Sequence, residues 1–312
     1  MKRLCRMRLI ENHAVQTLSE KAVETDRILF ARILVATDFS AISRRALLYA
    51  LSLGRRYESK IYLAHVIPER PLESSDSNVN GHRAAEQHME EFIGAISWDA
   101  DSCTVLIENG EGPLYLWVTM ERLIHKHKID LIVAGTHGLS ARPAPFLGSG
   151  AEQIFRHATC PMLTIGPATQ TSDLPEIAFK NILYVTDFGP SAERARRYVV
   201  SVARKFKARV TFLHVVEDMA GSGPQELDHL RQIHIQRMKH SFLASHEDGI
   251  QADFYVRFGK VVDEILSTAH EIHAALIVMG AKATGGWAGH VPLSTAYNVA
   301  AKASCPLLTV RA

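Results

Sequence analysis

Three glycines and a serine near the middle of the chain have the types and the spacing to bind phosphate. Gly135 and Gly138 follow the apolar run DLIVA, and Gly148 and Ser149 come after nine further residues. Glycine lets the backbone turn with positive φ and approach a ligand closely. A helix that begins at Ser149 would add free N–H groups, the positive end of its dipole and a hydroxyl donor. The segment predicts a loop that wraps phosphate, although similar turns occur without a ligand, and GxGxxG and Walker A patterns are absent.

Asp38 supplies a second polar group that would face the same ligand. It ends the first apolar run, in VATDFS, and the first and fourth strands of a parallel sheet would be neighbours at a switch point. A carboxylate at that place can accept hydrogen bonds from an adenine amino group or from ribose hydroxyls. The alternative role for Asp38 is to cap the following helix, for which Ser40 competes.

Short apolar runs that alternate with helical patterns would position these residues. In the first half we expect strands at about 32–37, 60–66, 102–107, 130–135 and 161–166, with helices at about 40–57, 82–98, 113–128 and 149–158. In the second half we expect helices near 190–206, 225–247, 260–273 and 294–303. The strands are apolar almost throughout, as strands covered on both faces are. The alternation predicts an α/β fold with a parallel sheet between two layers of helices.

The second half of the chain repeats the first. RILVATDFS at 32–40 matches NILYVTDFG at 181–189, and HATCPMLTI at 157–165 matches KASCPLLTV at 302–310. Two more pairs keep the same order, at 60–69 with 209–218 and at 130–138 with 275–283. The repetition predicts a duplicated domain. We therefore divide the chain into an N-terminal extension (1–30, a tail or a docked helix), a first domain (31–167), a linker (168–179) and a second domain (180–312).

Composition and charge exclude several classes of partner. The chain carries 35 basic and 33 acidic residues, a balance that argues against nucleic acid and anionic membranes. No apolar stretch is long enough to span a membrane, and the basic N-terminus lacks a signal-peptide core. The four cysteines (Cys5, Cys103, Cys160, Cys305) lie far apart, which predicts reduced thiols, buried packing roles and a cytoplasmic setting.

Sixteen histidines raise the question of a metal site. They form no tight pair at helical i, i+4 spacing, so helix-surface histidine is the better interpretation and no metal site is predicted. His65 and His214 recur at the same strand position of the two halves. For these two we favour a hydrogen-bonded histidine near the end of the sheet.

The order of these segments resembles the universal stress protein family in its tandem two-domain form. ILVATDFS, AHVIPE, LIVAGTHG, the glycine spacing and HATCPMLTI carry the resemblance, which extends over residues 31–312. It implies two five-stranded Rossmann-like domains, each with strand order 3-2-1-4-5. It also implies an internal pseudo-dimer in which the last strands, CPMLTI and CPLLTV, meet; a further homodimer is left open. Many members of the family bind ATP, whereas others have lost the loop.

The resemblance implies an ATP site in the first domain. Asp38 would meet the adenine and ribose, Val66 would offer backbone contacts to adenine, and the glycine loop would hold the phosphates. ATP would bring Mg²⁺, for which Glu152 is the nearest carboxylate. The loop prolines Pro143 and Pro145 would either stiffen the loop or remove donors from it. The full set of residues implied is Asp38, Val66, Ala134, Gly135, Thr136, Gly138, Gly148, Ser149 and Gly150.

The second domain keeps the site only in part. Asp187 and Val216 remain, but Ala283 and Leu293 stand where the second and third glycines would be. A leucine puts a bulky side chain where phosphate should meet bare backbone. We therefore predict a degenerate second site, formed by Asp187, Val216, Gly280, Ala283, Leu293 and Ser294.

The resulting hypothesis is a cytoplasmic stress-response protein that binds ATP in its first domain as a regulatory ligand. The sequence offers no clear general base or arginine finger, so at most slow ATP hydrolysis is expected. One alternative is an interaction scaffold, or a binder of another small ligand. Another is a nucleotidyl-transfer enzyme, which ranks last because HIGH, KMSKS and SGG-x-DS words are absent.

Overall fold

The computed structural model describes most of the two repeated halves. The described residues are 30–68, 75–94, 96, 103–112, 114–138, 146–169, 177–217, 223–243, 249–281 and 294–311. Several positions named above lie outside them, namely residues 1–29, Pro143, Pro145, Ala283 and Leu293.

Each half alternates strands with helices, as the sequence predicts. The first half contains β1 (Arg32–Ala36), α2 (Ala41–Tyr57), β2 (Lys60–Ile67), α3 (Ser75–Gly94), β3 (Cys103–Asn109), α4 (Tyr115–His127), β4 (Leu131–Gly135), α5 (Ser149–His157) and β5 (Met162–Ile165). The second half contains β6 (Asn181–Val185), α6 (Pro190–Phe206), β7 (Arg209–Val216), α7 (Pro224–Leu243), β8 (Ala252–Phe258), α8 (Val261–Glu271), β9 (Leu276–Gly280), α9 (Thr295–Lys302) and β10 (Leu307–Val310).

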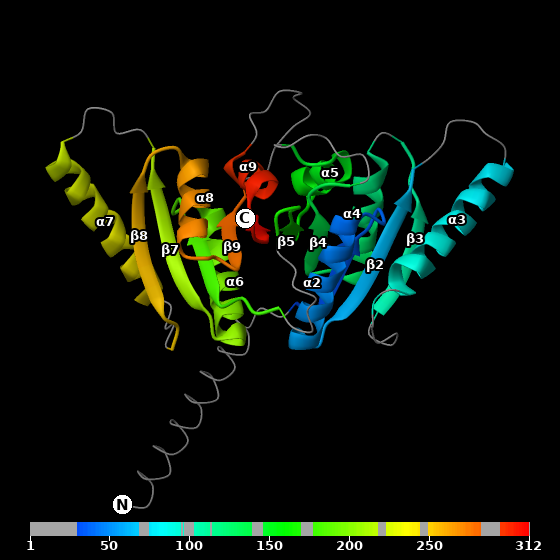
Figure 1. Ribbon diagram of the computed structural model, residues 1–312, viewed down its shortest axis with the longest axis horizontal. Helices are drawn as coiled ribbons and strands as arrows, with labels where there is room; N and C mark the ends of the chain where they lie inside the picture. The colour runs from blue at the N-terminus through cyan, green and yellow to red at the C-terminus, as the bar shows by residue number, and fades with distance from the viewer. Residues whose placement is uncertain are drawn as a thin grey trace, which may run out of the picture.

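The strands form one ten-stranded sheet in the order β3-β2-β1-β4-β5-β10-β9-β6-β7-β8. Within each half all pairs are parallel, and the order is 3-2-1-4-5 counted from the first strand of that half. The predicted fold class is therefore confirmed. Among the strands that the structure describes, one pair is antiparallel, β5 with β10 at the centre of the sheet, so the two halves share a single sheet (Figure 1).

Alternation along the strands sends side chains into two separate cores. Ile33 and Val35 of β1 point to the face covered by α2, α3, α6 and α7, whereas Leu34 points to the face covered by α4, α5, α8 and α9. Successive residues of a strand face opposite sides, so an apolar run is needed to fill both cores. Both cores run through the two halves, which makes the halves one packed body.

Contacts between the halves come in reciprocal pairs. Leu163 and Leu308, which are equivalent in the repeat, face each other across β5 and β10. On either side, Thr164 Oγ1 donates to the carbonyl of Leu307 at 3.2 Å and Thr309 Oγ1 donates to the carbonyl of Met162 at 3.3 Å. Contacts of this kind are expected of two equivalent units related by a twofold rotation.

A second reciprocal pair joins the C-terminal ends of α2 and α6. The guanidinium of Arg56 lies 5.5 Å from the ring centroid of Phe206, and the ammonium of Lys205 lies 5.4 Å from that of Tyr57. Phe30, which we assigned to the N-terminal extension, is buried with its ring 5.1 Å from Tyr57. The packed body therefore begins by residue 30.

Two local expectations are corrected by the structure. Helix α3 begins at Ser75 rather than near residue 82. The residues of α3 that precede position 82 are rich in Ser, Asp and Asn, and they lack the periodic apolar residues by which a helix is predicted from sequence. Strands β3 and β8 are only partly buried although we expected strands covered on both faces, because they form the two edges of the sheet.

Gly135 and Gly280 mark the places where a helix crosses closest to a strand. A Cβ on Gly135 would lie 2.8 Å from Ile42 Cγ2 of α2, and one on Gly280 would lie 2.5 Å from the backbone nitrogen of Ala192 in α6. Real Cβ atoms do not approach so closely. This contact explains why the second loop keeps this glycine: the fold requires it with or without a ligand.

We expect Gly280→Ala to destabilise the protein by about 1–3 kcal/mol, because the methyl group would press on the backbone of α6. The measurement is the midpoint of thermal unfolding followed by circular dichroism. Gly81→Ala is the control, because no atom lies within 4 Å of the Cβ position in the middle of α3 and alanine favours a helix. Equal midpoints for Gly280→Ala and the wild type would show that α6 does not need this close approach.

Candidate functional site

A cavity of about 440 Å³ opens at the carboxyl ends of β1 and β4. These strands are neighbours, with Ala36 beside Ala134, and the chain leaves them toward opposite sides of the sheet. Ligands of open α/β sheets bind at such a switch point. Eight of the nine residues that the sequence implied line this cavity: Asp38, Val66, Ala134, Gly135, Gly138, Gly148, Ser149 and Gly150.

Thr136 is the exception, and its role differs from the one expected. Its side chain is fully buried, with Oγ1 2.9 Å from Nδ1 of His137. Its carbonyl accepts a hydrogen bond of 2.8 Å from the backbone N–H of Gly148. Thr136 therefore does not line the cavity; it ties together the two arms of the glycine loop.

Asp38 sits in the turn between β1 and α2, half-buried at the cavity wall. Its Oδ1 accepts a hydrogen bond of 3.1 Å from the backbone N–H of Ser40. The helix cap is Ser40, whose Oγ accepts from the N–H of Ser43 at 3.1 Å. Because Ser40 caps α2, the other oxygen of Asp38 is directed elsewhere, toward the backbone of Gly138.

Two glycines of the loop, Gly138 and Gly148, lie so close to neighbouring protein atoms that a side chain would crowd them. A Cβ on Gly138 would lie 2.1 Å from Oδ2 of Asp38, and one on Gly148 would lie 3.3 Å from the nitrogen of Gly138. Neither they nor Gly135 has positive φ; among the described glycines Gly112, Gly249 and Gly259 do. The expectation of left-handed turns is therefore wrong, whereas the expectation of close approach holds inside the protein itself.

The N-terminus of α5 faces this cavity with its first turn uncapped by any side chain. Its N-cap is Gly148, and Ser149, Gly150 and Ala151 of the first turn line the cavity. The first N–H groups of a helix lack intrahelical acceptors, and the helix dipole adds positive potential there. The arrangement suits an anion such as phosphate.

Glu152, the carboxylate considered for Mg²⁺, is already paired. It accepts from Arg156 on the next turn of α5 at 2.8 Å. In the part of the chain that the structure describes, no group of three or more His, Cys, Asp or Glu side chains could hold a metal ion. The residues present therefore fit a phosphate group better than a protein-bound cation.

Aromatic rings that we did not assign to the site from the sequence line another part of the cavity. Phe39, His65, His88 and Tyr115 all contribute to its wall. The ring of Phe39 lies 4.3 Å from that of His65 and 5.7 Å from that of His88. Flat aromatic faces of this kind suit a planar ring. The available signal was the recurrence of Phe39 and His65 as Phe188 and His214 in the repeat.

The half-buried His65 is hydrogen-bonded, as expected. Its Nδ1 lies 2.9 Å from the carbonyl of Thr37, so this nitrogen carries the proton. His214 makes the same bond to Thr186 at 2.8 Å. Burial lowers the pKa of both imidazoles, and the carbonyl only partly opposes that shift.

Comparison with known proteins gives the same architecture. The model of the universal stress protein family matches residues 29–166 and again residues 178–311. The chain belongs to the universal stress protein family. A universal stress protein of Methanocaldococcus jannaschii is 25% identical over 145 residues, which are 44% of this chain and 82% of that protein. A putative universal stress protein of Staphylococcus aureus is 28% identical over 154 residues, 47% of this chain and 89% of that protein.

A solved structure shows the tandem form. The crystal structure of a universal stress protein from Archaeoglobus fulgidus matches with a TM-score of 0.65 and 20% identity, covering 91% of this chain and 99% of that one. At this identity the likeness shows the fold alone. Among the described residues, no helix has the length and apolar character needed to cross a membrane.

The second universal stress protein domain arranges the equivalent residues differently. Asp187 is exposed and accepts from the N–H of Gly189 at 2.9 Å. The ring of Phe188, equivalent to Phe39, is covered by the guanidinium of Arg237 at 4.0 Å. The N-terminus of α9 is capped by its own Ser294, whose Oγ accepts from the N–H of Tyr297 at 3.2 Å.

The remaining predicted residues of the second site that the structure describes lie at the corresponding strand ends. Val216 ends β7 and Gly280 ends β9. Gly280 packs against α6, as described above, and Val216 contacts the core shared by α6 and α7.

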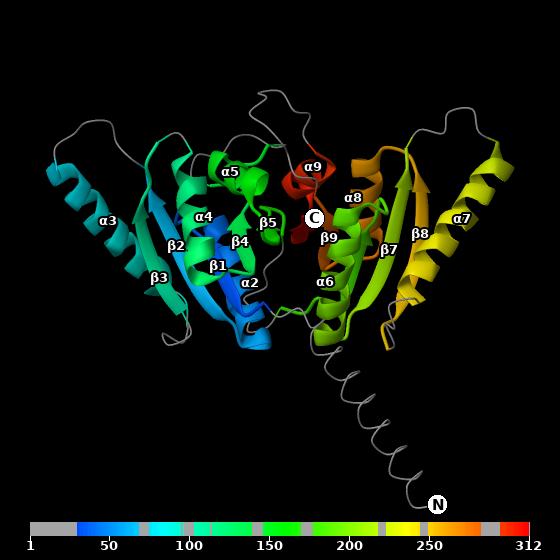
Figure 2. The ribbon, with the colours of Figure 1, turned by 180° about the vertical axis from the view of Figure 1, so that it is seen from behind.

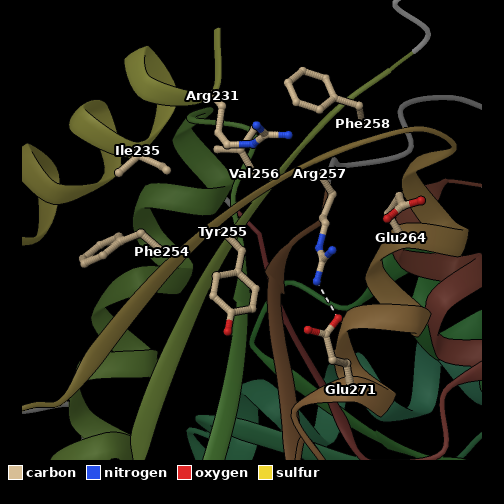
Figure 3. Close-up of a pocket in the computed structure, with 9 residues that line it drawn as sticks. All are labelled: Arg231, Ile235, Phe254, Tyr255, Val256, Arg257, Phe258, Glu264 and Glu271. Atoms are coloured by element: carbon tan, nitrogen blue, oxygen red, sulfur yellow. Dashed lines mark hydrogen bonds and ion pairs between the residues drawn. The ribbon is translucent and has the colours of Figure 1, made fainter. Parts of the chain in front are cut away.

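A cavity of about 460 Å³ between α7, β8 and α8 is a weaker candidate (Figure 3). Its two arginines are already engaged: Arg257 with Glu271, and Arg231 with the ring of Phe258. In the first half the matching edge strand and helix carry Glu108 and Arg122, 3.0 Å apart, with the charges exchanged. A charge pair kept in exchanged form in both halves indicates that it fastens an edge strand to a helix.

The three cysteines that the structure describes and Trp117 are packing residues. Burial raises the pKa of Cys103, Cys160 and Cys305 to about 12, so their thiols stay protonated and unreactive. The ring of Trp117 is buried and stacks 5.7 Å from that of His157.

We expect the protein to lose stability as the pH falls below about 6.5, the ordinary pKa of histidine. In the folded state the pKa values of His65 and His214 are lowered, so below that pH the unfolded chain binds protons that the folded chain resists. The measurement is the thermal midpoint at about pH 7.5 and about pH 5.5, for the wild type, His65→Asn and His214→Asn. Asparagine keeps a donor near the Nδ1 position without a titrating ring.

Each asparagine variant should lose less stability than the wild type over this pH range. An identical drop in all three proteins would mean that other groups carry the pH dependence.

Proposed function

We propose that the first domain of this universal stress protein binds ATP, and that ATP acts as a regulatory ligand. One observation carries the proposal: the uncapped N-terminus of α5 and the carboxylate of Asp38 line the same cavity. An anion-binding helix end and an acceptor for amino or hydroxyl groups are the two recognition elements that an adenine nucleotide requires.

The phosphate part of the cavity supports this proposal through its backbone. Gly148, Ser149 and Gly150 bring the first turn of α5 to the cavity without bulky side chains. The carbonyl of Thr136 holds the Gly148 N–H, which fixes the start of the helix in place. Donors that are already oriented need no rearrangement when the phosphates arrive.

Aromatic side chains and Asp38 support binding of the adenosine moiety in the other part of the cavity. Phe39, His65 and His88 offer flat surfaces, and Val66 brings the end of β2 to the cavity. Asp38 lines the cavity, with Oδ1 held by the N–H of Ser40 and Oδ2 beside Gly138. In this proposal Asp38 accepts from ribose hydroxyls or from the adenine amino group.

The second domain, in the same proposal, binds no ATP. Ser294 satisfies an N–H of the first turn of α9 that a phosphate would otherwise use. Arg237 covers the ring of Phe188. In the sequence, Leu293 stands at the position of Gly148, which also favours a second domain that does not bind ATP.

We assign ATP a regulatory rather than a catalytic role, in the cytoplasm, where few and distant cysteines are usual. A ligand shifts a conformational equilibrium only by its difference in affinity for the two states.

Isothermal titration of the purified protein with ATP tests the proposal, with Asp38→Ala and Asp187→Ala as a matched pair. We expect about one ATP per chain in the wild type. The Asp38→Ala variant should bind ATP about 10- to 100-fold more weakly, because it loses hydrogen bonds to a charged group. Asp187→Ala, the same change at the equivalent turn of the second domain, should bind ATP as the wild type does.

A second variant tests the loop independently. Gly148→Leu copies into the first loop the residue found at 293 and should abolish ATP binding. Absence of ATP binding by the wild type at millimolar concentration would favour a scaffold or another small ligand. Two ATP per chain, or equal losses from the two aspartate variants, would contradict the proposed degeneracy of the second domain.

A further inference from the structure

Helix α5 of the first domain is held at both ends by side chains of the second domain. We propose that Tyr297 and Arg311, together called the α5 clamp, are positioning residues for the ATP site of the first domain. The inference rests on the proposed function and extends it, because it makes the second domain part of the first site. Figures 1 and 2 show α5 and α9 side by side above the junction of the two halves.

Tyr297 holds the start of α5. Its hydroxyl accepts a hydrogen bond of 3.1 Å from the backbone N–H of Leu147, the residue before the N-cap Gly148. Leu147 is fully buried and Tyr297 is 3% exposed, so water cannot easily replace this acceptor. The ring of Tyr297 also meets that of Phe155 edge to face at 5.9 Å. A buried donor left without its partner costs more than an average hydrogen bond contributes.

Arg311 holds the end of the same helix. Its Nη1 donates to the carbonyl of Arg156 at 2.7 Å, and its Nη2 donates to the carbonyl of Phe155. Carbonyls in the last turn of a helix lack intrahelical donors, and a cation there complements the helix dipole. The second domain therefore sets the position of α5 along its axis from both sides.

The clamp is asymmetric, unlike the reciprocal contacts of β5 with β10 and of the ends of α2 and α6. Strand registers relate residues 145 positions apart, as in Ile132 beside Met162 and Ile277 beside Leu307. By that relation Glu152 corresponds to Tyr297 and Gly166 to Arg311. Glu152 is paired with Arg156 inside α5, and Gly166 has no side chain. These two positions of the first domain therefore give α9 no matching support.

This asymmetry favours the domain that keeps its glycine loop. The first-turn N–H groups of α5 must stand in the right place before the phosphates arrive, and preorganisation reduces the cost of binding. Side chains of the second domain supply that preorganisation, whereas the equivalent helix α9 is capped by its own Ser294. The clamp gives a physical reason for the second domain to persist after the loss of its own site.

Titrations with ATP and with adenosine separate positioning from general stability. Tyr297→Phe and Arg311→Met should each weaken ATP binding about three- to tenfold. Neither should change adenosine affinity, because adenosine has no phosphate to meet α5. Arg311→Lys should recover most of the loss, because an ammonium can still donate to the last carbonyls. Tyr255→Phe, the same change at the distant β8, is the matched control and should bind both ligands as the wild type does.

Hydrogen exchange of the ligand-free protein gives a second readout. The amide of Leu147 and those of the first turn of α5 should exchange faster in Tyr297→Phe than in the wild type, while α9 is unchanged. Thermal midpoints report whether any variant has lost its fold.

The outcomes distinguish this inference from the proposed function. Wild-type binding of ATP with equal ATP affinity in both clamp variants would overturn the clamp alone. Parallel losses for ATP and adenosine would show a merely structural role and would also overturn it. Absence of ATP binding by the wild type would overturn the proposed function, and the positioning role with it.

Discussion

The antiparallel pairing of β5 with β10 is the interaction on which the rest of the structure depends. It turns two five-stranded sheets into one and brings equivalent residues, Leu163 and Leu308, face to face. Because α5 precedes β5 and α9 precedes β10, the same pairing brings these helices together. Without it the second domain would have no access to the helix that faces the first cavity.

The two copies have diverged in a way that separates the needs of the fold from those of the site. Gly135 and Gly280 are both kept because a helix crosses both strand ends closely. The charge pair of each edge strand is kept with its signs exchanged, which preserves attraction between the same two elements. Gly148, by contrast, aligns with Leu293 in the sequence. In the first domain the close contact of Gly148 is with the nitrogen of Gly138 inside the loop, 3.3 Å from a Cβ position, and not with a crossing helix.

The histidine and phenylalanine next to the cavity also combine a feature that both domains keep with one in which they differ. Both copies keep the half-buried histidine and its bond to the threonine carbonyl, at His65 and His214. They differ in what covers the neighbouring phenylalanine: Phe39 lines a cavity, whereas Phe188 lies under Arg237. A shared framework therefore carries an open surface in one domain and a filled one in the other.

The sequence by itself determined the repeat and the alternation of strands with helices, and the resemblance to the universal stress protein family supplied the strand order. Of the nine residues that the resemblance implied for the first site, eight line the cavity. Apolar periodicity and the spacing of glycines are local signals, whereas the rules for connecting parallel strands reduce the number of topologies without fixing one order. Only the tertiary structure decided that Thr136 is buried, that rings from α3 and α4 reach the cavity, and that Tyr297 and Arg311 hold α5. These contacts join residues far apart in the chain, and side-chain direction across a domain junction leaves no periodic trace in the sequence.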